Sequence, residues 1–388
     1  MKLIIKLLIL IFPFLILANN YFYYNGNLFF NFLLIIFESI VILFLIMLAK
    51  RFLFNKTMVF FLAVFFITTV IINNYWTPGA LLNILVLLSY SFALINACLI
   101  LNYEKTLGLF FFYSVFLILF FFLGYHFILT GFNSYKTLYY DISAANGVFH
   151  LLDSTLTIPL LVILFLFSSS YVTNNIYKII ILLFCFTCLL FLQRRGPLLI
   201  ALVFLILSIF KVESKFFYKT VLIVPLVITL GVSIFIEEIQ GLLSVIDLLE
   251  RKGSSASNDE RMGLYIHFLQ DLKDFQILDY LKGHIDTFKN IVPDKKYQHP
   301  HNSLITLLFL SGILTVFFYI RIHFTLINQL IDKKLFIWAR IILTFFLLSF
   351  TESLLNNFNF FSIMYMSLLY YFLVKLKFKQ DVIIEIHQ

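Results

Sequence analysis

The chain has 388 residues, of which 62% are hydrophobic and only 12% are charged. A water-soluble domain of this length needs far more charged surface, so the composition excludes that class of protein. A net charge of +8 would suggest nucleic acid binding in a soluble protein, but in a membrane protein it reports orientation, and we expect no nucleic acid partner.

Apolar runs long enough to cross the hydrocarbon core as helices recur along the whole chain. The first of them is interpreted as an uncleaved helix and not as a signal peptide, because the following NNYFYYNGN lacks a small-residue cleavage site. The predicted fold class is an all-α polytopic membrane protein, with residues 1–388 forming a single membrane domain. About twelve transmembrane helices are expected, at 3–18, 28–49, 57–73, 80–101, 106–124, 155–172, 178–192, 197–210, 220–236, 301–320, 335–350 and 358–374.

Two polar features lie inside predicted spans. Glu38 is in the middle of LLIIFESIVILF, where it is either functional or protonated and bonded to a neighbouring helix, and the sequence favours the second alternative. Cys185 and Cys188 form a CxxC within LLFCFTCLLF. No histidine or acid lies near these thiols, so core packing is favoured over a redox or metal site.

Lysine and arginine are concentrated in alternate short loops, for example at Lys50, Lys211, Lys333 and Lys375. The positive-inside rule places these loops, and both chain termini, in the cytoplasm. The long loop at 237–300 then faces the periplasm, and its opening GLLSVIDLLE is expected to form an amphipathic helix along the membrane surface. We expect short helices of this kind to be inserted between the spans.

Arg194 and Arg195 do not fit this charge pattern. They lie in FLQRRGPLLIAL, between two spans at the non-cytoplasmic boundary, where orientation does not call for them. One explanation is that the two arginines anchor the spans by extending their charged ends to the membrane interface. The adjacent Gly196 permits close approach of a ligand to the backbone, so a functional role is favoured for at least one of the two arginines.

A third arginine lies in the long loop, within SNDERMGLYIHFL. Ser257 and Glu260 are spaced as a capping box, which places Arg261 in the first turn of a helix. A cation is disfavoured at that end of the helix dipole unless an anion is close by. That anion is either a neighbouring carboxylate, such as Asp259, or a ligand, and the sequence leaves both open.

The loop ends in QHPHNSLITLLFLSG, where polar residues precede an apolar segment. Pro300 restricts the backbone and would hold His301 at the start of the next helix, which Asn302 and Ser303 can cap. The alternative for His301 is an interfacial histidine with a satisfied ring. Arginine forks bind phosphate oxygens, and a neutral histidine accepts a proton from a hydroxyl. Together these residues suggest a hydroxyl attacking a carbon whose leaving group is a phosphate or diphosphate.

Three segments resemble motifs of the bacterial O-antigen ligases and O-antigen polymerases. RRGPLLIAL resembles their first arginine element and DERMGLYIHFL their second; HNSLITLLFLSGILT resembles their histidine motif. The resemblance implies a C-superfamily glycosyltransferase bundle in which Arg195 and Arg261 hold a diphosphate. It also implies that Arg194 is an auxiliary cation, that His301 is the base or orients the acceptor hydroxyl, and that Asn302 supports it. Family members often have serine or threonine where this chain has Arg194, so the register of the two arginines is open.

The resemblance also implies partners and a location. The donor would be a glycan on undecaprenyl diphosphate and the acceptor a sugar or lipid A–core, in the bacterial inner membrane alongside other polysaccharide-assembly proteins. The first loop lacks Asp and Glu, unlike in metal-dependent relatives, so we expect no metal and no cofactor. Direct attack of the hydroxyl on the anomeric carbon would invert its configuration. The compact long loop and short termini favour a polymerase slightly over a ligase.

The rival function is transport, as by a flippase for lipid-linked oligosaccharides. A carrier should have paired, interrupted helices and charged groups near the membrane midplane. Only Glu38 is clearly in the middle of a span, whereas the strongest polar features gather at one face, which favours an enzyme. A purely structural scaffold would leave the arginines unexplained.

Overall fold

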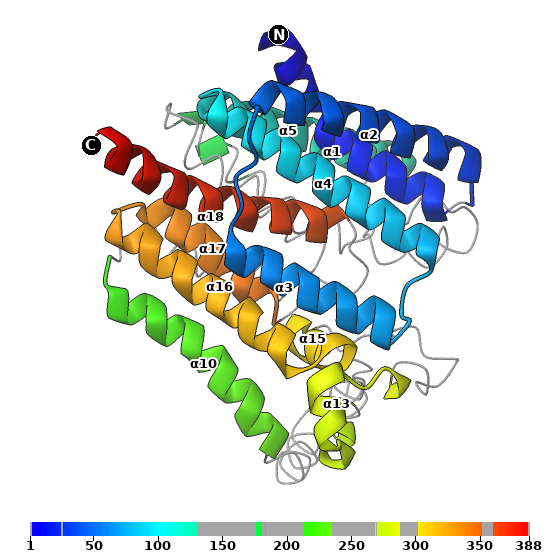
Figure 1. Cartoon of the computed structure of the whole chain (residues 1–388), viewed down its shortest axis with the longest axis vertical. Coiled ribbons are helices and arrows are strands. Elements are labelled where there is room, and N and C mark those ends of the chain that lie inside the picture. Colours follow the sequence, from blue (N-terminus) through cyan, green and yellow to red (C-terminus); the bar gives the residue numbers. More distant parts are fainter. Residues whose placement is uncertain are drawn as a thin grey trace. The chain divides into compact units, whose positions relative to one another are not determined.

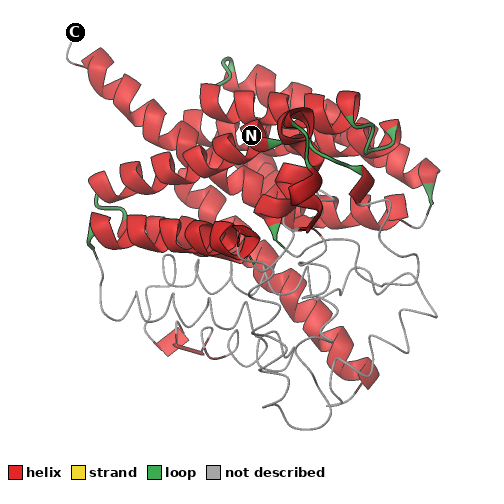
Figure 2. Cartoon of the chain, turned by 90° about the horizontal axis from the view of Figure 1, so that it is seen from below, coloured by secondary structure: helices red, strands yellow, loops and turns green. Residues whose placement is uncertain are grey.

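The computed structural model of the chain describes residues 2–24, 26–130, 213–234, 270–287, 302–350 and 360–386, with a few single positions elsewhere. These residues form helices and loops, and no strand is found among them (Figure 2). The chain divides into two compact units, each of which is built from separate parts of the sequence. Unit 1 comprises Met1–Asn55, Pro78–Phe210 and Phe358–Gln388, and unit 2 comprises Lys56–Thr77 and Lys211–Asn357.

Four helices are long and apolar enough to cross a membrane: Lys2–Asn19, Leu28–Ala49, Pro78–Ile100 and Ile313–Asp332. Two further apolar helices, Lys56–Ile72 and Phe336–Leu348, are shorter. The helical, membrane-compatible character of the chain is therefore confirmed over the described residues. The number of twelve spans and the topology stay predictions, and the expected spans 155–172 and 197–210 lie outside the described residues.

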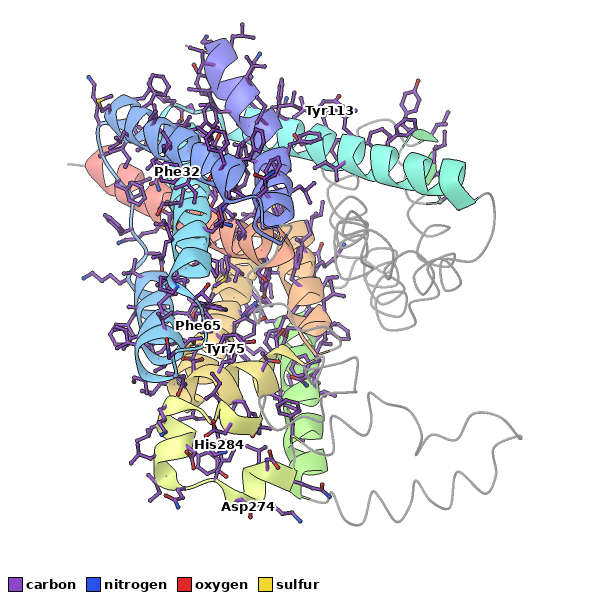
Figure 3. All side chains as sticks on the ribbon, turned by 90° about the vertical axis from the view of Figure 1, so that its right-hand side faces the viewer. Phe32, Phe65, Tyr75, Tyr113, Asp274 and His284 are labelled. Atoms are coloured by element: carbon purple, nitrogen blue, oxygen red, sulfur yellow. The ribbon has the colours of Figure 1, made fainter. Side chains whose placement is uncertain are left out.

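Unit 1 is arranged around a central helix, α4. Most of α4 is buried, whereas α2 exposes most of its surface. Large side chains such as Phe32 on α2 and Tyr113 on α5 point outward, as expected of surfaces that face lipid (Figure 3). The helices of this unit that are seen in Figure 1 are α1 (Lys2–Tyr24), α2 (Leu28–Ala49), α4 (Pro78–Ile100), α5 (Glu104–Thr130) and α18 (Phe360–Ile386).

A polar network ties the connector after α2 to the core of unit 1. The backbone N–H of Leu53 donates to Oδ1 of Asn96 on α4, over 2.8 Å. The hydroxyl of Tyr370 on α18 donates to the Leu53 carbonyl, over 2.6 Å, and Asn96 also bonds to that hydroxyl. Both backbone polar groups of Leu53 thus have a partner from a helix, as is usual for buried backbone groups.

Unit 2 is built on α16, which packs against α17, α15, α3 and α10. Its elements are α3 (Lys56–Phe66), the π-helix η1 (Ile67–Ile72), α10 (Lys215–Ile234), the 3₁₀ turn η4 (Leu272–Asp274), α13 (Ile277–Lys282), α15 (Ser303–Ser311), α16 (Ile313–Asp332) and α17 (Phe336–Leu348). An ion pair joins Lys215 at the start of α10 to Asp332 at the end of α16. The basic segments of these two helices, which were predicted for the same membrane face, therefore lie at one end of unit 2.

The expectation of one continuous span at 301–320 is wrong. The chain forms two helices there, α15 and α16, separated at Gly312. Gly312 has φ +80° and ψ 178°, a conformation that is open essentially to glycine alone. An added Cβ would lie 2.5 Å from the carbonyl carbon of Leu281, so the backbone of α13 occupies the space that a side chain at this position would need.

Candidate functional site

The histidine motif begins at the buried start of α15. Asn302 is the N-cap residue and is only 2% exposed; its Oδ1 accepts hydrogen bonds from the N–H groups of Leu304, at 3.0 Å, and Ile305, at 3.2 Å. The N–H of Ser303 donates to the carbonyl of Ser349, just after α17, over 2.6 Å. The prediction that Asn302 caps this helix is confirmed. The first three amide groups of α15 thus all have acceptors within the protein.

The start of α15 is joined to the end of α17. Phe346 of α17 packs against Tyr319 and His323 of α16, and Ser349 follows α17 directly. Because the N–H of Ser303 bonds to the Ser349 carbonyl, the cap of α15 is fixed to a helix that itself packs against α16. The motif therefore opens a short helix whose polar start is inserted into unit 2.

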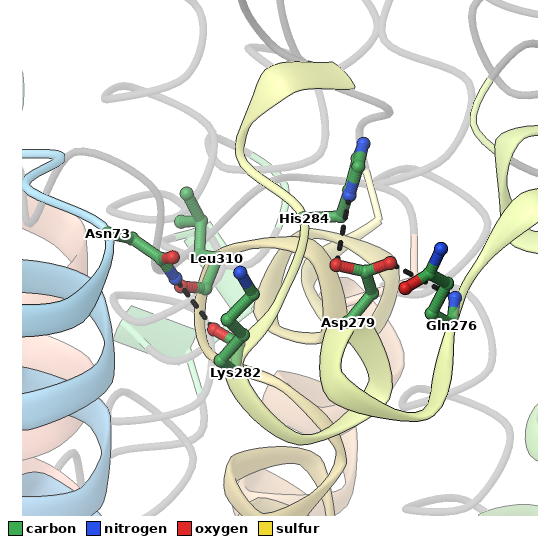
Figure 4. A network of polar contacts seen from close by, with 6 residues as sticks. All are labelled: Asn73, Gln276, Asp279, Lys282, His284 and Leu310. Atoms are coloured by element: carbon green, nitrogen blue, oxygen red, sulfur yellow. Dashed lines mark hydrogen bonds and ion pairs between the residues drawn. The ribbon is translucent and has the colours of Figure 1, made fainter.

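The other end of α15 is held by the segment around α13. Asn73, which follows η1, donates from Nδ2 to the carbonyls of Lys282, at 2.6 Å, and Leu310, at 2.8 Å (Figure 4). The N–H of His284 donates to the Phe309 carbonyl over 2.8 Å. Gly283, at φ +87°, lets the two backbones meet, since an added Cβ there would lie 2.5 Å from the Phe309 carbonyl oxygen. We call this set of contacts the α13 clamp.

The π-helix explains why Asn73 reaches the α13 clamp. The N–H of Asn73 donates to the carbonyl of Thr68, five residues earlier, over 3.0 Å. This turn is wider than a turn of α-helix, so the end of the helix lies in a different position from the one that a regular α-helix would give it. In that position the Asn73 side chain points at two carbonyls from distant parts of the sequence. Asn73 was not among the residues predicted for the site, although an asparagine pair directly after the apolar segment 58–72 was a visible signal.

An acidic side chain fixes α13 itself. Oδ2 of Asp279 accepts from the backbone N–H of Gln276 at 3.0 Å, and Oδ1 lies 3.3 Å from Nδ1 of His284 (Figure 4). Partial burial acts to raise the pKa of Asp279. The bonds from Gln276 and His284, with the charge of Lys282 nearby, outweigh it, and the pKa lies below its ordinary value.

The predicted cations lie outside the described residues. Arg194, Arg195, Arg261 and His301 are among the positions not described, as is the CxxC pair, so their mutual placement stays a prediction. His301 directly precedes the N-cap residue that is described. Among the described residues, no three His, Cys, Asp or Glu side chains form a metal-ligand set, and the expectation of a metal-independent site stays open.

A second polar cluster lies in unit 1, around Glu38. Its Oε1 accepts a hydrogen bond from Nδ2 of Asn19 on α1 over 2.7 Å, and both side chains are fully buried. The prediction that this acid bonds to a neighbouring helix is confirmed.

Comparison with known proteins adds no identification: no protein-family model matches the sequence, and no curated protein matches it significantly.

Proposed function

We propose that the chain is a membrane glycosyltransferase that moves a glycan from undecaprenyl diphosphate to an acceptor sugar hydroxyl on the periplasmic face. It would act in O-antigen or other surface polysaccharide assembly in the bacterial inner membrane, with both termini in the cytoplasm. Polymerisation is slightly favoured over ligation to lipid A–core. The observation that carries the proposal is the start of α15: the residue after His301 is a buried cap inserted into unit 2, so the motif leads directly into the bundle.

The capping pattern indicates which groups would bind a diphosphate. A helix N-terminus ordinarily offers its first amide groups to anions, but those of α15 are already bonded to Asn302 and Ser349. An anion next to the motif would therefore need side-chain donors. Guanidinium forks suit diphosphate oxygens, which supports the assignment of Arg195 and Arg261 to this role, with Arg194 as an additional cation.

The reaction follows from these roles. His301 accepts the proton of the acceptor hydroxyl while that oxygen attacks the anomeric carbon. The bond from this carbon to the diphosphate oxygen breaks, the configuration inverts, and the diphosphate leaves with its negative charge next to the arginines. Stabilising that charge would be the largest catalytic contribution. Asn302 contributes by fixing the helix that follows His301, since its side-chain oxygen is engaged in the cap.

The first test is a transfer assay with purified protein, a lipid-linked glycan donor and a sugar acceptor. His301→Ala should abolish transfer while the protein remains folded and inserted. His387→Ala is the control, because His387 lies 86 residues after His301 in the sequence and outside the three motifs. Arg261→Lys should be severely impaired, because a point charge does not replace a bidentate fork. Normal transfer by a well-expressed His301→Ala variant would remove the assignment of the base.

A chromosomal deletion would separate the two enzyme functions. Loss of all O-antigen from a lipopolysaccharide gel, with polymer accumulating on the lipid carrier, indicates a ligase. A core capped by a single repeat indicates a polymerase. Normal long-chain O-antigen in the deletion strain would contradict both.

Transport is the second candidate, and two observations favour it. Gly312 interrupts the helical segment that precedes α16, and Glu38 is buried in the middle of α2. Interrupted helices and intramembrane acids are features of carriers. The sidedness of the lipid-linked glycan in the deletion strain distinguishes the functions. It remains at the cytoplasmic face if a flippase is lost, and it reaches the periplasmic face if a transferase is lost.

A further inference from the structure

Helices α1, α2 and α4 enclose a group of polar side chains that the proposed transfer reaction does not use. Asn19, Glu38 and Tyr90 come from these three helices, and each is fully buried. Asn19 donates to one oxygen of Glu38 over 2.7 Å, and the Tyr90 ring stacks on Phe12 of α1 at 5.4 Å between centroids. Tyr90 also lies within electrostatic reach of the Glu38 carboxyl group. A polar pocket of this kind inside an apolar bundle calls for an explanation.

Three polar atoms of this group have no hydrogen-bond partner within the protein: Oε2 of Glu38, Oδ1 of Asn19 and the hydroxyl of Tyr90. Leaving such atoms unpaired in an apolar interior is costly. Their chemistry is complementary, because an amide oxygen accepts and a tyrosine hydroxyl donates. These atoms offer the donors and acceptors that a buried water molecule requires.

The surroundings indicate that Glu38 carries a proton. Within the described part of the chain Glu38 has no ion pair, and the basic residues of α1, α2 and α4 are confined to Lys2 and Lys6. Lys6 is 13 residues from Asn19, which is about 20 Å along a helix. A carboxylate with one amide donor and no cation is strongly disfavoured inside a membrane. A bound proton removes that charge and turns Oε2 into a donor.

A second polar level connects this site to one end of the helices. Asn31 lies seven residues before Glu38 on α2, and Asn83 lies seven residues before Tyr90 on α4. Seven residues are two turns, or about 10 Å, so each asparagine shares a helix face with the deeper group. Both asparagines are buried, and the Oδ1 of each is unpaired. They add buried polar groups between the start of α2 and α4 and the deeper level of Glu38 and Tyr90.

We propose that Glu38 is an exchangeable proton-binding site, linked through water to Asn19 and Tyr90 and reached along Asn31 and Asn83. Hydronium delivers a proton to the carboxylate and leaves as water, and the reverse step returns the proton. The site belongs to α1, α2 and α4 alone, so it does not depend on the proposed transfer chemistry.

Infrared spectroscopy of the whole protein in lipid vesicles tests this proposal. At neutral pH we expect a carbonyl-stretching band of a protonated carboxylic acid, which shifts when H₂O is exchanged for D₂O. Glu38→Gln should lose the band, whereas Glu104→Gln should keep it, because Glu104 is ion-paired with Lys375 and is therefore a carboxylate. If Glu38→Gln does not fold, labelling the native protein with ¹³C-glutamate assigns the band to a glutamic acid.

Exchange kinetics test the path separately from the site. Replacing Asn31 and Asn83 together with leucine should slow the D₂O shift several-fold and leave the band itself in place. Absence of the band, or a band that does not shift in D₂O, would overturn the proposal. So would loss of the band on replacing choline chloride with sodium chloride at constant ionic strength, because that result would assign the site to a metal cation. An exchange rate unchanged in the double variant would overturn the path.

Discussion

Replacing Gly312 with alanine tests the junction between α15 and α16 most directly. Alanine at φ +80° and ψ 178° costs about 1–3 kcal/mol of backbone strain. Its Cβ would also lie 2.5 Å from the Leu281 carbonyl carbon and 2.9 Å from the Tyr280 carbonyl oxygen, and these are backbone atoms that cannot rotate away. Forcing α13 outward adds about 1–3 kcal/mol, as other overpacked sites do. We therefore expect Gly312→Ala to lose about 2–6 kcal/mol of stability.

Two other glycines separate these contributions. Gly26 has φ +66° but open space around its Cβ position, so Gly26→Ala should lose only about 1–2 kcal/mol from strain. Gly79 lies in α4 with neither an unusual φ nor a neighbour within 4 Å, and alanine there should be neutral or stabilise by about 0.5–1 kcal/mol. Thermal unfolding in detergent, followed by size-exclusion chromatography, gives the ranking. Equal midpoints for Gly312→Ala and Gly79→Ala would refute the proposed contact between α13 and the junction.

Three further outcomes are expected from the same unit. Asn302→Ser should keep the cap, whereas Asn302→Ala should cost about 1 kcal/mol and lower transfer activity; equal stability of the two variants would contradict the capping role. Asn73→Leu leaves two carbonyls of the α13 clamp without their donor and should cost about 2 kcal/mol in unfolding measurements; unchanged stability would contradict the role of Asn73 in the clamp. The pKa of Asp279 is lower in the folded protein than in the unfolded chain, where it is about 3.9. The carboxylate therefore stabilises the fold at pH values above about 3.9, and this stabilisation is lost as the pH falls through the lower pKa of the folded protein. Native protein and Asp279→Asn should therefore differ in unfolding midpoint at neutral pH, and the difference should begin to shrink near pH 4 and vanish only below the lowered pKa of the folded protein; a difference independent of pH would contradict this.

Helix positions were predictable wherever apolar runs end in polar residues. The span expected at 28–49 coincides with α2, because Asn27 precedes it and Lys50 ends it in a left-handed conformation at φ 59°. The span expected at 57–73 matches α3 with η1 in extent, but hydropathy does not distinguish an α-helix from a π-helix. Hydropathy reports which segments avoid water. It does not report how the backbone turns within them.

The break at Gly312 shows the same limit more sharply. Ser311 and Gly312 form a pair that can mark a turn, but a glycine within an apolar segment is also tolerated inside a helix, so the sequence does not decide between a break and a continuous span. The contact of Gly312 with the α13 backbone, about 30 residues earlier, is visible only in the structure. Asn302 was predictable because capping depends on neighbours two and three residues away. The partners of Asn73 are more than 200 residues distant, so its role followed only from the fold. Sequence reasoning succeeded where the determining contact is local.

This distinction bears on the histidine motif itself. Three of its positions have structural roles: Asn302 caps α15, Gly312 permits the break, and Thr315 bonds to the Ser311 carbonyl at 3.2 Å. The spacing of the motif therefore describes a short capped helix that is followed by a turn, and any protein needing that shape would select similar residues. His301 is the member for which this local geometry supplies no reason. The functional hypothesis thus depends on His301 and the arginines, and variants of those residues, not of the rest of the motif, decide it.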